Sequence, residues 1–176
     1  MFIKNFYIIL QLGGSMKILM MRHGDSVRET KDDINRSLTM NGINESRQIA
    51  KWLKDKKFYI DCVLTSPYRR TIQTLLQINS ILNIRYRNIL SELKPQGKPS
   101  VVIQYLKTMV LNKTESVLLI SHLPFMSNLV KILCPNEERV ILFQTSSITC
   151  MHFSVFNDQC KLLWDINSSD INKKYI

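Results

Sequence analysis

Short runs of apolar residues alternate along this chain with longer stretches in which apolar residues recur every three or four positions. Apolar runs of about four to eight residues, bounded by polar or turn-forming residues, are typical of buried strands. Six segments are predicted as strands, and the third of them is polar enough to be expected near the edge of a sheet. They are 17–21, 61–65, 85–90, 116–120, 147–156 and 161–166.

The stretches between these strands have the periodicity of amphipathic helices. Thr39 or Asn41 is suited to cap the first helix, because both side chains accept hydrogen bonds from exposed backbone N–H groups. In the second helix the expected apolar face consists of Ile72, Leu75, Leu76 and Leu82. The predicted helices are 41–55, 68–82, 100–111 and 125–133.

Strands and helices therefore alternate until the last two strands, which are separated only by the turn 157–159. Such alternation is typical of an α/β domain whose parallel sheet is covered by helices on both faces. The short final connection favours an antiparallel hairpin instead. We expect a three-layer α/β/α sandwich with a mostly parallel central sheet and an antiparallel C-terminal edge.

The length of 176 residues fits one compact domain, which we place at 16–176. Residues 1–15 are expected to be an N-terminal extension, either disordered or the result of a start codon placed before Met16. No apolar run reaches the roughly 20 residues of a membrane-spanning helix, so no membrane partner is expected. The four cysteines lack metal-ligand or redox spacing and indicate buried free thiols in a reducing cytoplasm.

The net charge of +10 is typical of proteins with acidic partners, but the basic residues are scattered along the chain rather than gathered in a stripe. Ile, Asn and Lys, whose codons are AT-rich, are abundant, and Ala50 is the single alanine. A biased nucleotide composition therefore accounts for the charge, and nucleic acid is not an expected partner. A basic rim would still attract a phosphorylated or acidic protein.

Reactive side chains follow three of the predicted strands, at 22–24, 66–70 and 121–122. Ligands of open parallel sheets bind at the carboxyl ends of the strands. If these strands are neighbours, two of the three histidines and at least two arginines meet there. Arginine binds phosphoryl oxygens in bidentate geometry, and a neutral imidazole is a competent nucleophile toward phosphorus. Gly24 would let the backbone approach the phosphate. The pattern predicts a phosphate site with His23 as its nucleophile.

In order and spacing, these segments resemble the histidine phosphatase (phosphoglycerate mutase-like) superfamily and, within it, most of all the SixA phosphohistidine phosphatases. The resemblance covers about residues 16–166, nearly the whole chain, and implies a phosphoglycerate mutase-like fold. The segments that carry it are Met21-Arg22-His23-Gly24-Asp25, Leu38-Thr39 with Gly42 and Glu45-Ser46-Arg47, Ser66-Pro67-Tyr68-Arg69-Arg70-Thr71-Ile72-Gln73-Thr74, Glu92-Leu93-Lys94-Pro95 with Gly97, and Ile120-Ser121-His122-Leu123-Pro124.

The resemblance implies a role for each matching residue of the phosphate pocket. His23 would be the phosphorylated nucleophile. Arg22, Arg70 and His122 would be catalytic and, together with Gly24, would bind the phosphate. The arginine of the family's Ser-Pro-x-x-Arg pattern is its fifth residue, which selects Arg70 rather than the arginine before it.

The proton donor to the leaving group is left open by the sequence. Glu92 stands where many superfamily members carry that donor, and Asp25 is the other carboxylate close to His23 in the chain. A protonated imidazole leaves phosphorus more easily than an alkoxide, so a phosphohistidine substrate needs less help from an acid. The candidates are therefore Glu92, Asp25 or no acid, and no metal or cofactor is expected.

The substrate is predicted from what lies between Arg70 and His122. This stretch lacks the long insertion with which a mutase closes over its intermediate, so water and bulky substrates are admitted. We expect a bacterial, cytoplasmic, metal-independent phosphatase that acts as a monomer on a histidine-phosphorylated phosphotransfer domain or phosphocarrier protein. The alternatives are a small-molecule phosphomonoesterase of the same superfamily and a non-catalytic module that binds phosphohistidine or nucleic acid.

Overall fold

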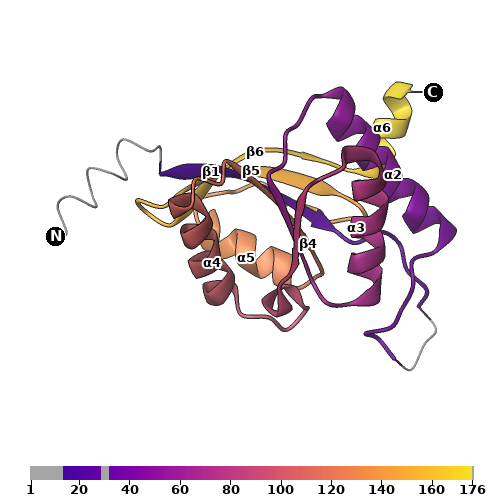
Figure 1. Ribbon diagram of the computed structural model, residues 1–176, viewed down its shortest axis with the longest axis horizontal. Coiled ribbons are helices and arrows are strands. Elements are labelled where there is room, and N and C mark those ends of the chain that lie inside the picture. The colour runs from indigo at the N-terminus through magenta and orange to yellow at the C-terminus, as the bar shows by residue number, and fades with distance from the viewer. Residues whose placement is uncertain (1–13, 29–31, 176) are drawn as a thin grey trace.

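In the computed structural model, which describes residues 14–28 and 32–175, the strands form one mixed sheet in the order β3-β2-β4-β1-β5-β6 (Figure 1). The strands are β1 (Ser15–Arg22), β2 (Cys62–Thr65), β3 (Tyr86–Ile89), β4 (Ser116–Ser121), β5 (Ile148–Ser154) and β6 (Gln159–Ile166). The helices are α2 (Met40–Asp55), α3 (Arg69–Leu82), α4 (Pro99–Leu111), α5 (Phe125–Leu133) and α6 (Ser168–Tyr175), together with the short 3-10 helix η1 (Ser91–Leu93).

Parallel pairing joins the neighbouring strands β3, β2, β4 and β1, and β5 and β6 continue the sheet as an antiparallel hairpin. This arrangement confirms the predicted α/β class with its antiparallel C-terminal edge. All residues of β3 are exposed, and β3 forms the opposite edge of the sheet, as its polar sequence predicted.

Helices cover both faces of the sheet, with α4 and α5 on one side and α2, α3 and α6 on the other (Figure 1). The side chains of β1 alternate between the two layers of the core. Ile18 and Met20 pack with residues of α4 and α5, whereas Leu19 and Met21 pack with residues of α2 and α3. A strand that is buried on both faces needs apolar residues at every position, which is why this segment is a continuous apolar run.

The expected apolar face of α3 was partly wrong. Leu76 is 59% exposed, whereas Thr71 and Thr74 are fully buried. The Thr71 hydroxyl donates a hydrogen bond to the carbonyl oxygen of Ser66 (2.8 Å), and the Thr74 hydroxyl donates one to that of Arg70 (2.8 Å). Because buried hydroxyls with such partners are tolerated, α3 can turn a partly polar face towards the strand ends.

Two further features concern the ends of the chain. Helix α6, which the sequence pattern did not predict, packs in the core through Ile171. The predicted N-terminal extension lies, up to residue 13, outside the described residues, and Ser15 already belongs to β1.

None of the helices in the described ranges is long and apolar enough to cross a membrane. The cysteines are free, as predicted, although only two of them, Cys134 and Cys150, are fully buried.

Candidate active site

The carboxyl ends of β1, β2 and β4 meet at one edge of the sheet. Arg22, the last residue of β1, pairs with Ser121 at the end of β4. Just past the strands, the N–H of His23 donates to the carbonyl oxygen of Ser121 (3.1 Å), and the N–H of Ser66 donates to that of Ile120 (3.1 Å). The three predicted segments therefore converge, because their strands are neighbours in the sheet.

His23 is 6% exposed, and both nitrogens of its imidazole are engaged. Nδ1 lies 2.7 Å from the carbonyl oxygen of Gly24, which only accepts hydrogen bonds, so Nδ1 carries the proton and donates. Nε2 accepts a hydrogen bond from Nε of Arg70 at 3.2 Å. This tautomer leaves the lone pair on Nε2, beside an arginine, where a nucleophile towards a bound phosphoryl group is needed.

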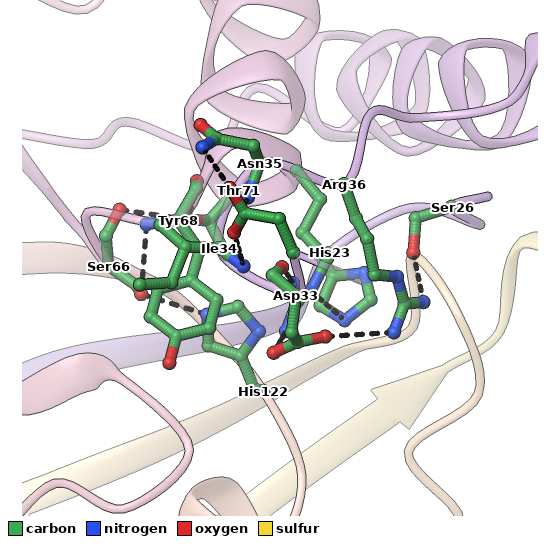
Figure 2. Close-up of polar contacts among 12 residues, drawn as sticks. His23, Ser26, Asp33, Ile34, Asn35, Arg36, Ser66, Tyr68, Thr71 and His122 are labelled. Atoms are coloured by element: carbon green, nitrogen blue, oxygen red, sulfur yellow. Dashed lines mark hydrogen bonds and ion pairs between the residues drawn. The ribbon is translucent and has the colours of Figure 1, made fainter. Parts of the chain in front are cut away.

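His122 lies next to His23, with the two ring centroids 5.1 Å apart. Its Nε2 is 2.8 Å from Oγ of Ser66, and the ring of Tyr68 packs edge-on against it with centroids 4.9 Å apart (Figure 2). Its Nδ1 is buried and has no hydrogen-bond partner among the described residues. A buried nitrogen without a partner is costly. In the tautomer whose Nε2 accepts from the Ser66 hydroxyl, the Nδ1–H of His122 can donate to a ligand oxygen.

The two adjacent arginines of the second segment differ in exposure. Arg70 is 4% exposed and lies at the site, whereas Arg69 is exposed to solvent. The guanidinium of Arg70 lies 4.8 Å from the centroid of the Tyr68 ring. Arg22 donates from Nη1 to the carbonyl oxygen of Phe143 (2.7 Å), while its buried Nε has no partner in the described part of the chain. The two predicted arginines therefore lie at the same strand ends as the histidines.

Sequence reasoning missed two charged residues at the site, Asp33 and Arg36. Oδ2 of Asp33 is 3.3 Å from Nη2 of Arg70, and its Oδ1 is 3.0 Å from Nη1 of Arg36. Arg36 also donates from Nη2 to the hydroxyl of Ser26 at 2.8 Å (Figure 2). Both residues lie in a loop without hydrophobic periodicity, where the sequence pattern gives no indication of which side chains turn inward.

Two glycines allow the loop after β1 to lie directly against the first turn of α2. A Cβ atom on Gly24 would lie 2.5 Å from the carbonyl oxygen of Gly42 and 2.8 Å from Oγ of Ser46. A Cβ atom on Gly42 would lie 2.1 Å from the carbonyl oxygen of Asp25. The N–H of Gly24 donates to Oγ1 of Thr74 at 3.0 Å, which joins the loop to α3 as well. These contacts fix the position of the preceding histidine.

The two candidate acids are engaged in local loop contacts. Oε2 of Glu92 accepts a hydrogen bond from the N–H of Lys98 (2.9 Å), and Oδ2 of Asp25 accepts one from the hydroxyl of Thr39 (2.8 Å). A proton-donor role for either residue stays a prediction. In residues 14–28 and 32–175, no three His, Cys, Asp or Glu side chains are grouped so that they could hold a metal ion.

Burial determines the protonation of both histidines. Burial lowers the pKa of His23 from 6.5 to about 4, partly offset by the hydrogen bond to Gly24 and reinforced by the charges of Arg70 and Arg22. Burial, followed by repulsion from His23 and Arg70, lowers the pKa of His122 to about 2. Both rings are therefore neutral at pH 7, and the positive charge of the site comes from its arginines, which suits an anionic ligand.

Comparison with known proteins gives a family and close relatives. Residues 18–95 match the model of the histidine phosphatase superfamily (branch 1). The chain is 42% identical to phosphohistidine phosphatase SixA of Escherichia coli (strain K12) over 134 residues, which are 76% of this chain and 83% of the relative. It is 30% identical to a phosphohistidine phosphatase SixA homolog of Haemophilus influenzae over 164 residues, or 89% of this chain and 93% of that one.

Solved structures agree with the sequence relatives. A structure of the protein histidine phosphatase SixA complexed with tungstate superimposes with a TM-score of 0.84 and 37% identity, covering 89% of this chain and 99% of that one. A phosphoglycerate mutase from Bacillus anthracis superimposes with a TM-score of 0.74 but 11% identity, covering 93% and 98%. The second match shows a shared fold alone, and it confirms the predicted phosphoglycerate mutase-like architecture.

Proposed function

The chain belongs to the histidine phosphatase superfamily, and we propose that it is a phosphohistidine phosphatase in which His23 is transiently phosphorylated. The observation that carries this proposal is the state of the His23 ring. Its Nδ1–H is held by the carbonyl oxygen of Gly24, and the Nε2 lone pair faces the arginine side of the site. The identity to the phosphohistidine phosphatases of two other organisms supports the same reaction.

In the first step, Arg22, Arg70 and His122 orient the phosphoryl group, and the Nε–H of Arg70 turns from Nε2 of His23 to a phosphoryl oxygen. Nε2 then attacks phosphorus in line while the P–N bond to the substrate imidazole breaks. The electron pair of the broken P–N bond stays on the substrate nitrogen, and the substrate imidazole leaves as a neutral ring that keeps the proton on its other nitrogen. The carbonyl oxygen of Gly24 stabilises the positive charge that develops on the His23 ring, and the guanidinium groups stabilise the charge on the transferring oxygens.

In the second step, water attacks the phosphorylated His23, the new P–N bond breaks, and inorganic phosphate leaves. The ring regains its lone pair on Nε2 and keeps its proton on Nδ1, so the enzyme returns to its starting state. We propose Glu92 or Asp25 as the donor where the leaving group needs a proton; the ready departure of imidazole makes that need small for phosphohistidine.

A protein is the proposed source of the phosphohistidine. Between Arg70 and His122 the described chain contains the rest of α3, then β3, η1, α4 and β4 with their connections, so this stretch holds no long insertion. A net charge of +10 favours encounter with an acidic or phosphorylated partner. We propose a histidine phosphotransfer domain or a phosphocarrier protein as substrate, in the bacterial cytoplasm, with the enzyme acting as a monomer.

The test uses a histidine-phosphorylated carrier protein with the phosphate radiolabelled. The parent enzyme should release inorganic phosphate and, after rapid quenching, carry an acid-labile label. His23→Asn should give neither, because the nucleophile is gone. His152→Asn is the matched control, since His152 is exposed on β5 opposite Lys17, at the far end of β1. Phosphate release by the His23→Asn protein at the parent rate would refute the proposal.

The same assay separates the two alternatives. Faster turnover of sugar phosphates than of the phosphorylated carrier would identify a small-molecule phosphomonoesterase. Tight binding of the phosphorylated carrier, or salt-sensitive binding of RNA, without phosphate release would identify a binding module.

A further inference from the structure

Asp33 holds the phosphate-binding arginines in the same way that a phosphate would. One of its carboxylate oxygens is 3.3 Å from Arg70. The other oxygen is 3.0 Å from Arg36, a contact drawn in Figure 2, so that a single anionic group bridges two guanidinium groups. Bidentate and bridging contacts of this kind are how arginine binds phosphoryl oxygens. The side chain therefore occupies positions that a phosphoryl group needs.

All the donor nitrogens of Arg70 are engaged within the protein. Nε donates to His23, Nη1 donates to the carbonyl oxygen of Asp33 at 2.6 Å, and Nη2 contacts the Asp33 carboxylate. Arg70 has five N–H groups, and these contacts use three of them. A phosphoryl group that binds in the place of the Asp33 carboxylate must therefore exchange the bond at Nη2. The bond to the carboxylate is the longest of the three and joins a buried arginine to an exposed acid.

The Asp33 carboxylate can move away from the phosphate clamp, formed by Arg36 and Arg70, without movement of the loop backbone. Its side chain is 54% exposed, whereas that of Arg70 is 4% exposed. The backbone next to it is fixed, because the N–H of Arg69 donates to the carbonyl oxygen of Ile34 at 3.0 Å and the carbonyl oxygen of Asp33 itself holds Arg70. Rotation about the side-chain bonds alone would move the carboxylate into water while Arg70 stays aligned.

From this geometry we infer that Asp33 is a positioning residue that occupies the phosphate clamp when the site is empty, and that the phosphoryl group of the substrate displaces it. The carboxylate holds Arg36 and Arg70 in the orientation that phosphate requires. It also competes with phosphate for the same donors, so it weakens the hold on inorganic phosphate and favours release of this product. This inference shares one premise with the proposed function, namely that these arginines bind the phosphoryl group.

The test is direct binding of inorganic phosphate to the full-length protein, measured by calorimetry at pH 7.5. Asp33→Asn removes the charge but keeps the shape, and Asp33→Ala removes the side chain but keeps the backbone bond to Arg70. Each should lower the Kd for phosphate about tenfold, the effect of losing two partly exposed ion pairs that compete with the ligand. Asp158→Asn is the matched control, since Asp158, in the β5–β6 turn, is 46% exposed and pairs with Lys107 of α4.

The possible outcomes separate this inference from the proposed function. Tighter binding by both Asp33 variants, with the Asp158→Asn protein unchanged from the parent, supports displacement of the carboxylate. Equal or weaker binding by the Asp33 variants overturns it and leaves Asp33 only an aligning contact for Arg70. If none of the proteins binds phosphate, the inference is wrong, and the proposed function is decided separately by phosphate release from the phosphorylated carrier.

Discussion

Acidification should destabilise this protein through its two buried histidines. His23 is 6% exposed and His122 is 1% exposed. Burial is the main reason that the pKa of His23 falls to about 4 and that of His122 to about 2. In the unfolded chain both rings titrate near the ordinary value of 6.5. The perturbation is a change from pH 7 to pH 5, which protonates the unfolded rings but not the folded ones.

The sign and size of the effect follow from linkage. Below pH 6.5 the unfolded state binds more protons than the folded state, so stability is lost as the pH falls, from 6.5 towards about 4 for His23 and towards about 2 for His122. One pKa unit corresponds to about 1.4 kcal/mol, and pH 5 lies about 1.5 units below the unfolded value. Each ring therefore costs about 2 kcal/mol at pH 5, and the two together about 4 kcal/mol.

The assay is urea denaturation at pH 7 and pH 5 in phosphate-free buffer, for the parent and for the double variant His23→Asn/His122→Asn. Carboxylates elsewhere in the chain titrate in both proteins. The free energy of unfolding that each protein loses between pH 7 and pH 5 therefore differs by the contribution of the two histidines. We expect the parent to lose about 4 kcal/mol more than the double variant. An equal loss in both proteins would show that the rings are not held neutral by burial.

Three further changes address the clamp, the packing and the acid. Arg70→Lys should lower kcat/KM for phosphohistidine about 100-fold, because an ammonium group cannot reproduce the planar fork, and an equal loss in Arg69→Lys would contradict this. Gly42→Ala should cost about 2 kcal/mol or more in urea denaturation, since its Cβ would lie 2.1 Å from a facing carbonyl oxygen. The exposed Asn44→Ala in the same helix is the control, and equal stabilities would contradict the argument. Glu92→Gln should slow hydrolysis of an alkyl phosphate about tenfold more than that of phosphohistidine in steady-state assays, and equal losses would exclude a donor role.

Local patterns were sufficient to predict where the candidate site residues lie in the fold. The apolar runs that became β1 and β4 are buried on both faces, so their positions and ends were evident from hydrophobicity alone. Reactive residues directly after such runs must lie at the carboxyl edge of a parallel sheet. The structure brings His23, Arg22, Arg70 and His122 together at that edge, which is where the sequence placed them.

Residues outside regular periodic segments could not be predicted in the same way. Helix α3 was expected to bury Leu76, yet it exposes this residue and buries Thr71 and Thr74, because hydrogen bonds satisfy the two hydroxyls. Periodicity counts apolar residues and contains no information on such partners. The polar helix α6 was missed for a related reason, since its apolar contact with the core among residues 168–171 is the single side chain of Ile171.

The sequence by itself determined which strands are central, which loops carry reactive groups and which family the chain resembles, because each of these depends on short contiguous segments. Only the tertiary structure decided how the loop at Asp33 and Arg36 folds onto the site and which nitrogen of His23 carries its proton. These features depend on contacts between segments far apart in the chain. Arg70 meets Asp33 and His23 because β1, β2 and the loop before α2 are brought to one place by the packing of the whole sheet.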